Sequence, residues 1–131
     1  MSEALLDTNV FISAESGRRL DRSALPERAF VSVITVAELE LGVLASPTTA
    51  VRARRLATLQ AISVLEALPV DLEAARRWAE LRQRLWEAGR RMNVNDLWIG
   101  AIAAARGLPV ATQDADFDAL EAIGAIELVR L

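Results

Sequence analysis

The chain has 131 residues, a length typical of one folded domain, and 53% of them are hydrophobic, so a substantial core can form. It contains no His and no Cys, which excludes histidine acid–base catalysis, thiol nucleophiles and the usual zinc sites. The formal net charge of −3 provides no overall basic field and counts slightly against a nucleic-acid partner unless local Arg clusters or metal ions hold the phosphates.

Short apolar runs alternate with helical patterns along the whole chain. In the first half of the chain we expect a strand at 4–6, a helix at 10–15, a polar loop at 16–28, a strand at 30–33, and helices at 35–44 and 49–61. A strand at 62–68 follows, then a helix from the N-cap Asp71 to about 88 and a helix from Asn93 or Asn95 to Gly107. The last expected elements are a strand at 109–112, a helix at 116–123 and a strand at 126–129. This alternation predicts an α/β fold with a parallel sheet covered on both faces, in a single domain over residues 1–131.

Five acids fall at or near one predicted edge of this sheet. Asp7 ends the first strand, Asp114 and Asp116 follow the fourth, Glu38 lies in the first turn of the helix after the second strand, and Asp96 opens the helix before the fourth. Ligands of open parallel sheets bind beyond the carboxyl ends of the strands. Their joint placement predicts one acidic pocket.

Each acid taken alone also has a purely structural explanation. Asp7 fits an Asx-turn after a strand, Glu38 fits a T-x-x-E capping box with Thr35, and Asp96 and Asp116 suit the first turn of a helix. Helical periodicity does not choose between Glu38 and Glu40. The functional hypothesis therefore depends on the convergence of the acids.

A cluster of carboxylates needs a cation to offset its repulsion. Carboxylate oxygens suit Mg²⁺ or Mn²⁺, and such a hydrated ion can lower the pKa of its water, orient it for in-line attack and shield a phosphate. One or two ions of this kind make histidine unnecessary, in agreement with the composition.

Four segments in this order resemble the PIN-domain ribonucleases, most closely the VapC-type toxins of bacterial type II toxin–antitoxin systems. The segments are Leu5–Val10, Ser32–Leu39, Asn95–Ala101 and Ala111–Phe117. The resemblance covers nearly the whole chain. It favours Glu38 over Glu40 and maps the catalytic and metal-binding acids onto Asp7, Glu38, Asp96, Asp114 and Asp116, with Asn9 and Thr112 as supporting residues. It leaves open whether Asp114 or Asp116 is the direct ligand.

The resemblance also implies a five-stranded parallel sheet of order 3-2-1-4-5 and an Mg²⁺- or Mn²⁺-dependent endoribonuclease that cleaves RNA with metal-activated water. It implies a homodimer and a cognate antitoxin protein, which together form a toxin–antitoxin hetero-oligomer. The N-terminus lacks the features of a secretory signal and no apolar run is long enough to cross a membrane, so a cytoplasmic protein is expected.

Two other functions fit parts of the same pattern. A PIN-like module that binds RNA or a protein without cutting would keep the same acids. A haloacid-dehalogenase-like phosphatase also ends its first strand with an Asp, but it needs a second Asp two residues later and a Lys. This chain has Asn9 at that position and contains no Lys, so the phosphatase is the weaker alternative.

Overall fold

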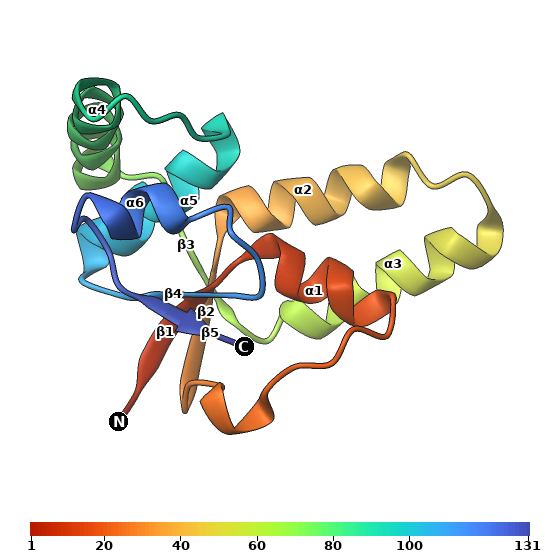
Figure 1. The fold of residues 1–131 in the computed structure, drawn as a ribbon. Coiled ribbons are helices and arrows are strands. Elements are labelled where there is room, and N and C mark those ends of the chain that lie inside the picture. Colours follow the sequence, from red (N-terminus) through yellow and green to blue (C-terminus); the bar gives the residue numbers. More distant parts are fainter.

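Five parallel strands form a single sheet at the centre of the molecule (Figure 1). The computed structural model describes all 131 residues. The strands are β1 (Glu3–Leu6), β2 (Arg28–Ser32), β3 (Glu66–Leu68), β4 (Val110–Thr112) and β5 (Leu128–Arg130). They follow the order β3-β2-β1-β4-β5, and every neighbouring pair is parallel. The expected fold class and strand order are confirmed.

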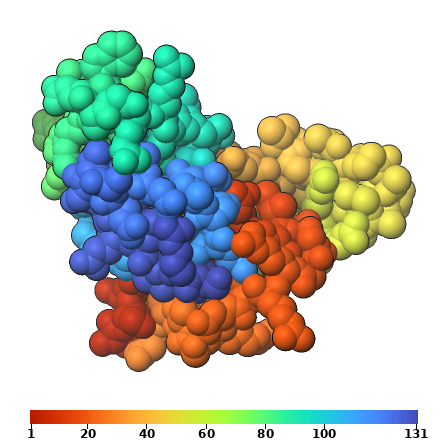
Figure 2. All heavy atoms as spheres, in the orientation of Figure 1, coloured from red at the N-terminus to blue at the C-terminus, as the bar shows by residue number.

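Helices surround this sheet and connect its strands. They are α1 (Thr8–Glu15), α2 (Val33–Leu44), α3 (Thr49–Ile62), α4 (Leu72–Glu87), α5 (Val94–Arg106) and α6 (Asp118–Ala122), with a 3-10 turn η1 (Arg22–Ala24). The α2–α3 hairpin projects from the rest of the molecule as an arm (Figures 1 and 2). None of the helices combines the length and the apolar composition needed to cross a bilayer.

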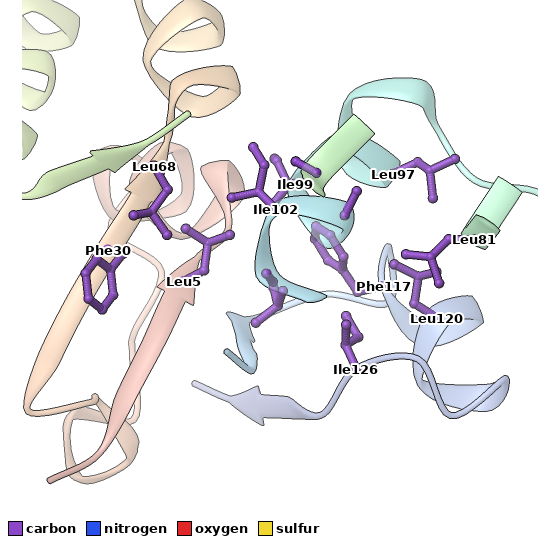
Figure 3. Close-up of a cluster of buried hydrophobic side chains, with 14 of the residues drawn as sticks. Leu5, Phe30, Leu68, Leu81, Leu97, Ile99, Ile102, Phe117, Leu120 and Ile126 are labelled. Atoms are coloured by element: carbon purple, nitrogen blue, oxygen red, sulfur yellow. The ribbon is translucent and has the colours of Figure 1, made fainter. Parts of the chain in front are cut away.

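The two faces of the sheet bury different side chains because residues alternate along a strand. Leu5 of β1 belongs to the larger core cluster, where Ile99 and Ile102 of α5 are buried. Figure 3 shows these two side chains within this cluster. The neighbours of Leu5 in β1, Ala4 and Leu6, belong to a smaller cluster on the other face of the sheet. Phe11 of α1 packs against that smaller cluster. The first strand is therefore covered on both sides, as its continuous apolar run predicted.

The apolar stripe of α4 faces the core, with Leu81 and Leu85 fully buried. Trp78 stacks on Trp98 of α5, with ring centroids 5.0 Å apart and ring planes 20° from parallel. Trp86, at the shoulder of this stripe, is 68% exposed. Trp78, Leu81 and Leu85 therefore pack inside the molecule, and among these residues of the stripe only Trp86 faces solvent.

Several expected boundaries are wrong, two of them for a clear local reason. The strand expected from residue 62 begins only at Glu66, because α3 continues to Ile62 and buries that side chain at its end. The second strand ends at Ser32, whose hydroxyl caps α2 by accepting from the backbone N–H of Thr35 at 3.1 Å. The helix expected over 116–123 is shorter, and α1 begins at Thr8 instead of Val10.

Candidate active site

The five predicted acids lie around the carboxyl edge of the sheet. Asp7 follows β1 and the segment with Asp114 and Asp116 follows β4, the strand paired with β1. Glu38 lies in α2, which follows β2, and Asp96 lies in the first turn of α5. Asp96 is close enough to the other four to feel the charge of each. The structure therefore brings together the residues that the sequence placed in one pocket.

Asp7 is the most enclosed of these acids, with no exposed surface. It occupies the N-cap position of α1 but accepts no capping hydrogen bond through its side chain. Its Oδ2 accepts from the hydroxyl of Thr112 at 3.0 Å, whereas Oδ1 is buried without any protein donor. Burial raises the pKa of Asp7 to about 6, although the Thr112 hydrogen bond opposes the rise. Burial and the contact with Thr112 therefore dominate this side chain, although the backbone of Asn9, two residues on as in an Asx-turn, also lowers its pKa.

Asn9 and Thr112 hold the carboxylates that follow β4. The side-chain amide of Asn9 donates to Asp114 Oδ2 at 2.7 Å and to Asp116 Oδ2 at 3.0 Å. The hydroxyl of Thr112 lies 3.3 Å from Asp114 Oδ1, and the backbone N–H of Asp116 donates to that same oxygen at 3.0 Å. Both amide hydrogens of Asn9 are thus used to orient acids.

Glu38 is oriented by Thr8, a residue that sequence reasoning missed. The hydroxyl of Thr8 donates to Glu38 Oε1 at 2.8 Å and lies 2.8 Å from the hydroxyl of Thr35. Because Ser32 caps α2, the alternative of a capping box between Thr35 and Glu38 is wrong. Glu40 is exposed, so the structure separates the two glutamates that periodicity left equivalent. The position of Thr8 directly after Asp7 was the available signal.

Asp96 has the most perturbed carboxyl group of the pocket. Burial, followed by repulsion from the other acids, raises its pKa to about 7. The pKa of Asp116 is also raised, first by burial and then by the charge of Asp114. Asp96 lies in the first turn of α5, as the structural explanation expected, whereas Asp116 lies before the N-cap of α6, so that explanation is wrong for Asp116. The neighbouring acids contribute to the raised pKa of both residues.

Two arginines fix the backbone of the loop that carries Asp114. Arg130 of β5 donates through Nη1 to the carbonyl of Asp114 at 2.7 Å and through Nη2 to the carboxylate of Asp118. Arg18 donates through Nη2 to the carbonyl of Gln113 at 2.8 Å. Arg18 is 95 residues away from Gln113 in the sequence, and α6 lies between Asp114 and Arg130. No local sequence pattern therefore pointed to either contact.

A hollow of about 450 Å³ adjoins Glu38 between α1, α2 and α3. The residues that line this hollow include the apolar Ile12, Leu39 and Val51 and the charged Glu38 and Arg54. Glu38 therefore lies at a cavity that has both apolar and charged walls.

The acids fit a hard divalent cation in their chemistry. All five supply carboxylate oxygens, and Asp7 Oδ1 is a buried oxygen with no donor of its own. No three of the acids lie close enough together to form a metal site in this structure.

A parallel sheet of this order with acids along its carboxyl edge defines a known class. The family model described as the PIN domain matches residues 4–123. The chain belongs to the PIN-domain family.

Its relatives narrow this class. The chain is 55% identical to Ribonuclease VapC5 of Mycobacterium tuberculosis over 97% of its own length and 94% of the relative's, and 41% identical to Ribonuclease VapC4 of the same organism over 95% and 96%. Among solved structures, it is similar to a member of the VapBC family of toxin–antitoxin systems, VapBC-5 from Mycobacterium tuberculosis, with a TM-score of 0.92, 50% identity and full coverage of both chains. The chain is also similar to DNA-bound VapBC from Salmonella typhimurium, with a TM-score of 0.82 and 30% identity. This match covers 99% of this chain and 98% of the other. Within its family the chain is of the VapC type.

Proposed function

We propose that the chain is the toxin of a toxin–antitoxin module and acts as an endoribonuclease that depends on Mg²⁺ or Mn²⁺. The observation that carries this proposal is the pocket in which Asp7, Glu38, Asp96, Asp114 and Asp116 converge without any His or Cys. The names of the relatives support it, since VapC5 and VapC4 are called ribonucleases and the similar solved structures are toxin–antitoxin complexes.

In this proposal the five acids hold the cation. When bound, the ion would activate water and neutralise charge on the phosphate being cut. Asp7 offers its unpartnered Oδ1. Asp114 is the better candidate for a direct ligand than Asp116, because the Asn9 amide and the backbone N–H of Asp116 both donate to its carboxylate. Asp116 is exposed, and in this proposal it is an additional acid beside the direct ligands.

The remaining polar residues orient these acids. Thr112 donates to Asp7, Asn9 to both acids after β4, and Thr8 to Glu38. Removing such supports from metal ligands typically costs 10- to 100-fold in metal affinity or activity. The raised pKa values of Asp7 and Asp96 mean that protons compete with the cation near neutral pH, so cation affinity should increase as pH rises through 6 to 7.

The proposed partners are an RNA strand and a cognate antitoxin, with the toxin itself a homodimer. An exposed apolar stripe on α2 is a surface of the kind that partners cover; it includes Val33, Leu41 and Leu44. The similarity to solved VapBC structures supports an antitoxin as partner of this chain.

Cleavage of RNA by the purified chain tests this function. We expect cutting only with added Mg²⁺ or Mn²⁺, and products with 5′-phosphate ends because the attacking group is water. Asp7→Asn should abolish cutting while the fold is retained, and Glu40→Gln, an exposed acid of the helix that carries Glu38, should cut normally. Cutting that persists in a chelator and leaves cyclic phosphates, or full activity of Asp7→Asn, would contradict the proposal.

A further inference from the structure

A second, basic hollow lies on the segment that follows α1. It measures about 400 Å³ and is lined by Ala14, Gly17, Arg18, Arg19, Leu20 and Arg22. All three arginines are exposed. Half of the lining residues are therefore cationic, in a protein whose net charge is −3.

The charges of these arginines are not neutralised within the molecule. The ion pairs of the structure involve Arg28, Arg77 and Arg130 only. The acid between them in sequence, Asp21, accepts from the backbone and the hydroxyl of Ser23 and so caps its own 3-10 turn. Three guanidinium groups around one hollow repel one another, and an anion placed there would relieve that repulsion.

The basic hollow adjoins the pocket of acids. Arg18 donates to the carbonyl of Gln113 at 2.8 Å, and the side-chain amide of Gln113 donates to the carbonyl of Arg19 at 2.7 Å. Gln113 directly precedes Asp114, so two hydrogen bonds join the arginine segment to the acidic loop. In Figure 2 the red and orange residues after the N-terminus lie against the blue C-terminal part on the same face.

We propose that Arg18, Arg19 and Arg22 form a subsite for backbone phosphates of the RNA strand next to the phosphate being cut. This inference rests on the proposed function. The planar fork of a guanidinium matches the oxygens of a phosphate. Phosphate contacts of this kind fix the position of a strand without reading its bases. The subsite supplies the local positive charge that the overall composition lacks.

The test uses the double variant Arg19→Gln/Arg22→Gln, which leaves the hydrogen bond from Arg18 to the acidic loop intact. A fluorescein-labelled single-stranded RNA is titrated with protein in the presence of a chelator, at several salt concentrations. The matched control is Arg76→Gln/Arg82→Gln, two exposed arginines of α4 without ion pairs, which changes the net charge by the same amount. Cleavage of the same RNA with Mn²⁺ provides KM and kcat.

We expect the slope of log affinity against log salt to become shallower by about 1.4 for the two lost contacts, which is on the order of a 20-fold weaker affinity at 0.1 M salt. KM should rise by a larger factor than kcat falls, and the α4 control should match the wild type. Affinity, slope and KM equal to those of the control would overturn the subsite. The subsite would also be overturned if the Arg19→Gln/Arg22→Gln variant lost affinity for an antitoxin but kept its affinity for RNA. If the wild type neither binds nor cuts RNA, the proposed function itself fails.

Discussion

Replacing Asp96 by Asn should stabilise the cation-free protein at alkaline pH. Burial and the neighbouring acids raise the pKa of Asp96 from 3.8 to about 7 in the folded chain. Between these two values the folded chain binds more protons than the unfolded chain does. Stability is therefore fully present below pH 3.8 and falls as pH rises through 7. An Asn at this position removes that loss.

The size of the effect follows from the same change in pKa. Raising a carboxyl pKa from 3.8 to about 7 corresponds to about 4 kcal/mol of destabilisation once the group is ionised. Asp96 is only partly buried, and solvent screens part of this repulsion, so we expect about half, or about 2 kcal/mol, at pH 8. At pH 5 the folded form is mostly protonated, and the gain should be below about 1 kcal/mol.

Urea unfolding in a chelator at both pH values measures this difference. Glu40→Gln, which removes an exposed acid, should change the free energy of unfolding by less than about 0.5 kcal/mol at either pH. With Mn²⁺ added, the wild type should gain more stability than Asp96→Asn, because the ion binds the folded site. An equal gain at pH 5 and pH 8 would refute the argument, because it would show that Asp96 is not ionised against its neighbours.

Two further variants test the supports of the site. Arg130→Gln should lower kcat roughly tenfold and raise the Mn²⁺ concentration needed for half-maximal cleavage, because Arg130 holds the carbonyl of Asp114; unchanged metal dependence would deny it this positioning role. Gly100→Ala should cost about 1 kcal/mol in urea unfolding, because the new Cβ would lie 2.3 Å from Cδ1 of the buried Leu120 and this crowding outweighs the better helix propensity of Ala. Gly42→Ala is its matched control: the new Cβ meets only Arg55 Cδ at 3.9 Å, so stability should rise, and loss in both variants would contradict the packing argument.

The sequence predicted the architecture because each strand carries its own local signal. The run Ala4–Leu6 is apolar throughout, as a strand covered on both faces requires, and it belongs to both core clusters. Boundaries were less predictable where one residue type suits two structures. Ile62 is apolar and β-branched, which suits a strand, yet it ends α3 and is buried there by tertiary packing.

The site was predictable to the extent that it depends on strand ends. In a parallel sheet the carboxyl ends share an edge, so Asp7 and Asp114 had to be neighbours once their strands paired. The contacts of Thr8 with Glu38 and of Arg130 with the acidic loop depend on how helices and loops settle on that edge. No periodicity or spacing encodes those contacts, since each joins segments that are distant in sequence.

The central position of β1 has a consequence for the timing of synthesis. Asp7 lies 105 residues before its hydrogen-bond partner Thr112, and Asp114 and Asp116 follow β4. During synthesis two of the five acids are therefore missing from the site until β4 and the loop after it emerge and β4 pairs with β1. A truncated product that ends before β4 would carry Asp7, Glu38 and Asp96 without the acids that follow β4, so it would lack the complete group of acids.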